Sequence, residues 1–218
     1  MLLENLLHEW PQVQVIESGG SYVPIDLSVG SAIIPSDDAN AMQQQIENYL
    51  KDSDAAVAYG GYDEERALYK RSSIFNSENG EARSIHIGLD LWAKAGTPVL
   101  AALDGEVHSF NYNAGFGNYG PTIILRHELK GITFHTLYGH LSAESIEEIE
   151  IGDKFTSGDI IATLGDASVN GNYAPHLHFQ IIKELGNYFG DYPGVCNKSD
   201  RDFFLSNCPD PNLLLKLN

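Results

Sequence analysis

The feature of this sequence that most restricts its fold is a series of short apolar stretches, separated by glycines, between residues 85 and 182. Many of their residues are β-branched or aromatic, as is typical of strands joined by tight turns. The predicted strands cover residues 85–92, 98–102, 105–112, 121–127, 132–139, 159–164 and 176–182. Many short strands with regular turns indicate an antiparallel sheet, a sandwich or a partly open barrel. We therefore expect a mainly β protein.

The segments on either side of this series have a different character. Apolar residues at 2, 3, 6, 7 and 10 predict a helix that ends before Pro11, and those at 42, 46, 49 and 50 predict a second one. Residues 55–84 form a long passage without a regular pattern. We expect an N-terminal helical and irregular extension packed on the core (1–84), a β domain (85–183) and a C-terminal tail (184–218).

The composition limits the partners and the compartment. A net charge of −17 argues against nucleic acid or an anionic membrane as partner, since both attract basic surfaces. No apolar run is long enough for membrane insertion, and the first thirty residues lack the pattern of a secretory signal. We expect a cytoplasmic protein on the sequence as given, or a periplasmic or extracellular one if a leader is missing. The oligomeric state is not indicated, and Cys196 and Cys208 are expected to be unpaired.

Two clusters of histidine and aspartate point to a metal. His176 and His178 stand at i and i+2 of a predicted strand, so their side chains point to one face, roughly 6–7 Å apart. His86 and Asp90 offer a nitrogen and an oxygen of the kind that zinc accepts. A straight strand would hold these two residues roughly 13 Å apart, so we expect a bend at Gly88. Together with one downstream histidine, His86 and Asp90 would leave the open fourth position of a catalytic zinc site.

The motifs and their order resemble those of the lysostaphin-type zinc metallopeptidases, which have the duplicated hybrid motif fold. Three motifs carry the resemblance: HxxxD at 86–90, YGHL at 138–141 and PHLHF at 175–179. The linking stretches at 96–99, 104–107 and 151–162 are similar to those of the family, and the match covers about residues 83–183. Known members mostly cut peptide cross-links in bacterial cell walls. The resemblance implies an all-β core with the site on one face of a sheet.

The resemblance also implies roles for individual residues. One Zn²⁺ ion would be held by His86, Asp90 and His178, with His140 and His176 as catalytic histidines that do not bind the metal. The expected function is that of a zinc-dependent metalloendopeptidase, in which two histidines assist a zinc-activated water. It would hydrolyse an amide bond in a peptide or peptidoglycan-type substrate, such as a peptidoglycan cross-link.

The sequence departs from the family pattern at two places. Residues 166–175 are longer than the usual turn before the PHLHF motif, and Gln180 stands where the family commonly has glutamate. We expect neither departure to touch a metal ligand, but both to change the shape of the substrate groove. Among the other histidines, we interpret His127 as a hydrogen-bond partner that orients a ligand.

Two other classes of function remain open. Peptidase-like domains also serve as non-catalytic binding or regulatory modules, although such modules are expected to have lost ligands. A histidine phosphocarrier of the sugar-transport system would use two neighbouring histidines in a similar β architecture. That chemistry has no use for His86 and Asp90, so the phosphocarrier ranks third.

Overall fold

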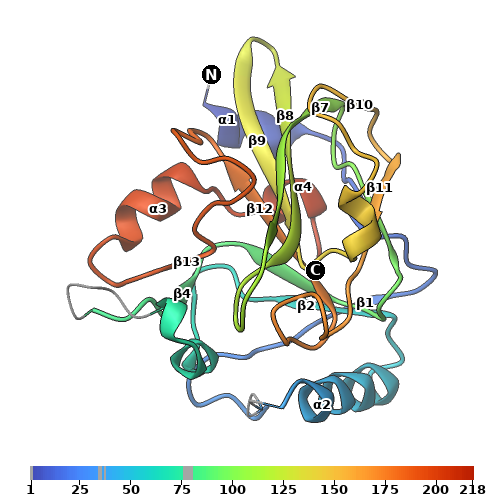
Figure 1. Ribbon diagram of the computed structural model, residues 1–218, viewed down its shortest axis with the longest axis vertical. Helices are drawn as coiled ribbons and strands as arrows, with labels where there is room; N and C mark the ends of the chain where they lie inside the picture. Colours follow the sequence, from blue (N-terminus) through green and yellow to red (C-terminus); the bar gives the residue numbers. More distant parts are fainter. Residues whose placement is uncertain (1, 34–35, 37, 76–80) are drawn as a thin grey trace.

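The computed structural model describes residues 2–33, 36, 38–75 and 81–218, and at its centre lies one large sheet (Figure 1). Every neighbouring pair in this sheet is antiparallel except β1 and β2, which are parallel. The expectation of a mainly β protein with an antiparallel core is confirmed. In spatial order the eight strands are β1 (Tyr22–Pro24), β2 (Val57–Gly60), β5 (Leu89–Trp92), β12 (His176–Ile182), β9 (Ile132–Gly139), β8 (Gly120–Leu129), β7 (Gly105–Asn113) and β10 (Lys154–Phe155).

Two smaller sheets and short helices surround this sheet. One small sheet pairs β11 (Ile160–Thr163) with β6 (Pro98–Leu100), and the other has the order β13 (Val195–Cys196), β4 (Ile85–His86), β3 (Glu64–Glu65). The α-helices are α1 (Leu3–Glu9), α2 (Ala39–Asp52), α3 (Arg201–Asn207) and α4 (Asn212–Leu215), and 3₁₀ turns cover 67–71, 73–75 and 143–146. No helix in the described part of the chain is long and apolar enough to cross a membrane.

The passage from residue 55 to 84 is more regular than the sequence predicts. Val57–Gly60 forms β2, which pairs with β5 so that Tyr59 lies opposite Leu91. The prediction of an irregular passage is therefore wrong here, because four residues are too few to show a strand pattern. Although the three-part division of the chain remains a prediction, the N-terminal segment contributes β1 and β2 to the central sheet.

The main core lies under the middle of this sheet. Its fully buried side chains include Leu125 of β8, Phe134 of β9 and Leu177 of β12. Leu3 and Leu7 of α1 pack into the same core, and every residue of β12 is buried. Strand β12 is thus held on both sides by paired strands and on both faces by packed side chains.

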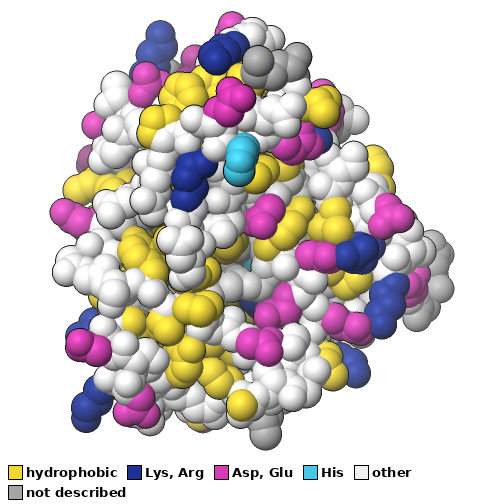
Figure 2. Space-filling view, turned by 180° about the vertical axis from the view of Figure 1, so that it is seen from behind, with side chains coloured by type: hydrophobic (Ala, Val, Ile, Leu, Met, Phe, Trp, Pro, Cys, Tyr) yellow, Lys and Arg dark blue, Asp and Glu magenta, His cyan; other side chains and the backbone are white. Residues whose placement is uncertain are grey.

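The surface reflects the acidic composition. On the face seen in Figure 2, acidic side chains are spread over the whole surface, whereas lysine and arginine side chains lie scattered among them. Hydrophobic side chains gather between these charged groups. Cys196 and Cys208 are buried and unpaired, as expected.

Replacing Leu125 by alanine should lower the free energy of unfolding by about 2–5 kcal/mol, because it removes a fully buried side chain and leaves a cavity. Urea denaturation followed by circular dichroism measures the change. The matched control is Ile151→Ala, since the Ile151 side chain is 60% exposed and its loss should cost less than about 0.5 kcal/mol. Equal losses in the two variants would contradict this description of the core.

Candidate metal centre

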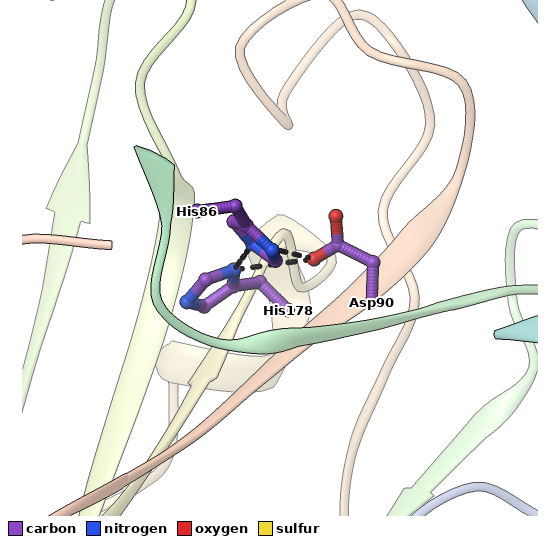
Figure 3. A group of neighbouring side chains, drawn as sticks. All are labelled: His86, Asp90 and His178. Carbon is purple, nitrogen blue, oxygen red and sulfur yellow. Dashed lines mark hydrogen bonds and ion pairs between the residues drawn. The ribbon is translucent and has the colours of Figure 1, made fainter. Parts of the chain in front are cut away.

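The side chains of His86, Asp90 and His178 converge on one point (Figure 3). His86 Nε2 lies 2.8 Å from His178 Nδ1, and each of these nitrogens lies 3.2 Å from Asp90 Oδ1. Zinc bonds of about 2.0–2.1 Å in a tetrahedral site place neighbouring donor atoms roughly 3.3 Å apart. Two imidazole nitrogens and one carboxylate oxygen at these separations fit a zinc ion that keeps one open position.

Strand pairing brings these three residues together. In the antiparallel ladder between β5 and β12, Asp90 lies directly opposite His178. His86 comes from β4, which belongs to a different sheet, so the chain changes sheets between His86 and Leu89. A Cβ on Gly88 would lie 2.5 Å from His178 Cε1, so glycine at the predicted bend also makes room for the ligand ring.

The backbone at Gly61 fixes the tautomer of His86. The carbonyl oxygen of Gly61 lies 2.7 Å from His86 Nδ1, and a carbonyl oxygen can only accept a hydrogen bond. His86 therefore carries its proton on Nδ1, which leaves the lone pair of Nε2 directed at the other two donors. A ligand histidine is commonly oriented in this way by an outer acceptor.

Gln180 fixes the tautomer of His178, so our expectation that this departure would not touch a ligand is wrong. Its Oε1 lies 2.9 Å from His178 Nε2. The side-chain nitrogen of Gln180 donates to the Pro193 carbonyl and to Cys208 Sγ, both at 3.2 Å, so the amide oxygen faces the histidine. His178 thus carries its proton on Nε2 and presents the lone pair of Nδ1 to the site.

Arg66 holds the third ligand. Its Nη1 donates to Asp90 Oδ2 at 2.6 Å and its Nε donates to Glu64 at 2.5 Å, while Asp90 Oδ1 faces the two histidines. Burial alone would raise the pKa of Asp90, but His86 and Arg66 hold this pKa well below its usual range. Sequence reasoning missed Arg66, because nothing in its neighbourhood distinguishes it from a surface arginine.

His140 and His176 complete the predicted set without joining the three donors. His140 Nδ1 donates to the Asn170 carbonyl at 2.9 Å, and His176 Nδ1 donates to the Ala174 carbonyl at 2.7 Å. Nε2 of each neutral ring is therefore a proton acceptor. The ring centroids lie 4.2 Å apart, and His176 Nε2 is 3.8 Å from Asp90 Oδ1. All five residues predicted from the sequence meet in one place.

The loop before β12 positions His140. The Asn170 side chain bonds to the backbone of Gly165 and Tyr173, which fixes the loop so that the Asn170 carbonyl reaches His140. His140 itself has φ of +67°, a left-handed conformation that costs roughly 1–3 kcal/mol in a residue other than glycine and is often found at functional sites. The lengthened turn noticed in the sequence is thus part of the site.

Burial favours the neutral form of His86, His140 and His176. It lowers the pKa of His86 to about 4, although Asp90 acts in the opposite direction. Burial also lowers the pKa of His140 well below the usual value for histidine and lowers that of His176. At neutral pH these rings keep the lone pairs that metal binding and proton transfer require.

A cavity of about 320 Å³ lies against these five residues. Segments outside the strand series form part of its wall, including Tyr69 and Phe75 on one side and Tyr192 and Pro193 on the other. The five site residues are themselves only 1–5% exposed. Because so little of them reaches the surface, a ligand would have to enter this cavity to meet them.

His127 does not orient a ligand, contrary to our interpretation of the sequence. Its two ring nitrogens bond to the Asp104 carbonyl and to Thr136 Oγ1, at 2.9 and 2.7 Å. It is 2% exposed and serves as a hydrogen-bonded core residue away from the metal centre.

Arg66→Met should lower the free energy of unfolding of the metal-free protein by roughly 3–5 kcal/mol at pH 7, because it leaves the Asp90 carboxylate buried without its partner. A depressed native pKa stabilises the fold above the unfolded pKa of about 3.9, so the difference from the parent protein should shrink as the pH falls below about 4. Urea denaturation across pH in the presence of a chelator measures both effects.

The control is Arg126→Met, which removes an ion pair with Glu106 whose partners are about 40% exposed. It should cost at most about 1 kcal/mol. If Arg66→Met cost no more than this control, Arg66 would not be compensating a buried charge.

Part of the chain is similar in sequence to known peptidases. The sequence profile of peptidase family M23 matches residues 84–189. The DD-carboxypeptidase/endopeptidase Mpg of Neisseria meningitidis is 34% identical over 125 residues, or 56% of this chain and 26% of that protein. The peptidoglycan DD-endopeptidase ShyC of Vibrio cholerae is 37% identical over 98 residues, or 44% of this chain and 20% of that protein.

Among solved structures, the catalytic domain of lysostaphin from Staphylococcus simulans matches with a TM-score of 0.39 and 29% identity, covering 56% of this chain and 80% of that chain. The alignments with the Neisseria and Vibrio proteins span only about a quarter and a fifth of their lengths. The matched segment contains all five residues of the site. Residues 84–189 of the chain thus match a peptidase M23 domain.

Proposed function

We propose that this chain is a zinc-dependent metalloendopeptidase that hydrolyses an amide bond, with peptidoglycan peptides as its substrate class. One observation carries the proposal. Two imidazole nitrogens and one carboxylate oxygen converge within 4.8 Å of one another, and two further histidines with acceptor nitrogens lie beside them. Relatives named as peptidoglycan endopeptidases support the substrate class.

In the proposed reaction the metal would activate a water molecule, and a histidine transfers its proton. Zinc bound by His86, Asp90 and His178 would lower the pKa of a bound water from about 15.7 to about 7 and polarise the carbonyl group of the substrate. Nε2 of His140 or of His176 accepts the proton of the attacking water and later returns it to the leaving amine. The cavity limits the access of bulk water, because its walls cover the ligands almost completely.

The residues around the ligands prepare the site for an ion. Gly61 and Gln180 fix both histidine tautomers, and Arg66 leaves one oxygen of Asp90 to face the histidines. These contacts exist in the protein itself, so little reorganisation is needed when a metal binds.

A non-catalytic binding module remains the second candidate function. It is favoured by the low exposure of the five site residues, since a site that is 1–5% exposed admits a large substrate only after the walls of the cavity move. The two candidates differ in whether the zinc-loaded protein turns over any peptide.

Protein stripped with a chelator and dialysed against zinc should take up one ion per chain, and His178→Ala should lose it, because two donors hold zinc far more weakly than three. Elemental analysis measures the stoichiometry. His127→Gln is the matched control, since His127 is equally buried but lies away from the centre, and it should retain one ion. Full zinc occupancy in His178→Ala would exclude the proposed ligand set.

His140→Ala should keep its zinc and lose about 10²–10⁴-fold in rate, because it removes a proton acceptor but no ligand. Hydrolysis of purified cross-linked peptidoglycan, with the products identified by mass spectrometry, measures the rate. His135→Gln alters a histidine outside the site and should act like the parent protein. Loss of zinc in His140→Ala would make His140 a ligand, and a zinc-loaded parent protein without turnover would favour the binding module.

A further inference from the structure

The cavity beside the metal centre contains a second carboxylate that the proposed reaction does not use. Asp191 lines this cavity, is half-buried and stands just beyond the family-matched segment. Among the described residues, no side chain donates a hydrogen bond to its carboxylate or forms an ion pair with it, and only the backbone of Tyr192 acts on it as a donor. A carboxylate can accept about four hydrogen bonds, so that of Asp191 has free capacity for a ligand.

The positive charge that acts on Asp191 is held away from it. Arg83 lines the same cavity, but its Nη2 donates to the Ile74 carbonyl and its guanidinium lies over the Phe75 ring, 5.4 Å from the ring centroid. Burial raises the pKa of Asp191, and the opposing effects of Tyr192 and Arg83 do not offset this. The ionised carboxylate therefore costs stability in the free protein, and a bound cation would compensate it.

The backbone on both sides of Asp191 is fixed to the central sheet. The backbone nitrogen of Gly190 donates to Ser109 Oγ at 2.9 Å, and the carbonyl of Gly190 accepts from another side chain of β7 at 2.8 Å. The Pro193 carbonyl accepts from the Gln180 side chain of β12 at 3.2 Å. Asp191 lies between these two anchors, so its position in the cavity wall is set before any ligand arrives.

Aromatic rings line the same side of the cavity. Tyr188 and Tyr192 both contribute to the wall, with ring centroids 4.9 Å apart, and Tyr188 is 47% exposed. The face of an aromatic ring is negative, so it attracts a cation in the same way as a carboxylate does. A neutral or anionic group would gain from neither. This part of the wall therefore favours a positively charged ligand.

We propose that Asp191 and the ring of Tyr188 form a subsite for a positively charged amino group of the substrate. The subsite rests on the proposed peptidase function and narrows its substrate class to peptides that carry a free ammonium group near the scissile amide. The ammonium group donates hydrogen bonds to the Asp191 carboxylate, and the ring of Tyr188 adds to the attraction.

Two forms of one substrate test this subsite: a dimeric peptidoglycan peptide with its free amino groups, and the same peptide after acetylation of these groups. For zinc-loaded parent protein, kcat/KM should be about 10–100-fold higher with the free amino groups. Asp191→Asn keeps the size of the side chain and removes its charge. It should abolish this preference through a higher KM for the free-amine peptide, with one zinc ion still bound. Its thermal midpoint should not fall, since the variant removes a poorly compensated charge.

The control is Asp52→Asn, which removes the same charge from an exposed side chain of α2 and should keep the full preference. Tyr188→Leu should reduce the preference severalfold, whereas Tyr188→Phe should keep it, because phenylalanine retains the ring. Equal effects of these two variants would overturn the role of Tyr188.

Equal hydrolysis of the two peptides by the parent protein would overturn the subsite and leave the peptidase function standing. A preference that persists in Asp191→Asn would do the same, since it would come from the bulk of the acetyl groups. A zinc-loaded parent protein that hydrolyses neither peptide would overturn the proposed function alone. Isothermal titration calorimetry would then decide on the subsite: tighter binding of the free-amine peptide, lost in Asp191→Asn, supports it, and equal binding of both peptides overturns it.

Discussion

The site depends on the register of β12 between two antiparallel partners. On one side His178 lies opposite Asp90 of β5, and on the other it lies opposite Gly139 of β9, one residue before His140. Since side chains alternate faces along a strand, a slip of one residue would turn both histidines of β12 away from Asp90. Complete burial of β12 makes such a slip costly. The register therefore fixes the ligand and the acceptor histidines at once.

Contacts from outside the family-matched segment complete the site. Gly61 and Arg66 precede the segment and bind His86 and Asp90, while Pro193 and Cys208 follow it and accept from the side chain of Gln180. A buried carboxylate is tolerated only with partners such as Arg66. The surrounding segments thus supply charge compensation, tautomer control and most of the cover over the ligands.

Some parts of this site could be predicted from the sequence and others could not, for physical reasons. The histidines of β12 and the HxxxD motif could be predicted from a few neighbouring residues. Side chains alternate faces along a strand, and histidine and aspartate are common metal ligands. Gln180 could have been assigned by the same alternation, since it stands two residues after His178 on the same face. Arg66 and Gly61 could not, because their contacts join distant segments without a periodic pattern. Strand β2 was missed because it spans only Val57–Gly60.

The claim that His86, Asp90 and His178 form the whole protein contribution to a zinc site is tested most directly by X-ray absorption at the zinc edge of the loaded protein. The spectrum should show two imidazole ligands, with the remaining donors being oxygens at about 2.0–2.2 Å. Three or more imidazoles would mean that His140 or His176 binds the metal, and a sulfur donor would place the metal elsewhere. Either result would contradict the division between ligands and catalytic histidines.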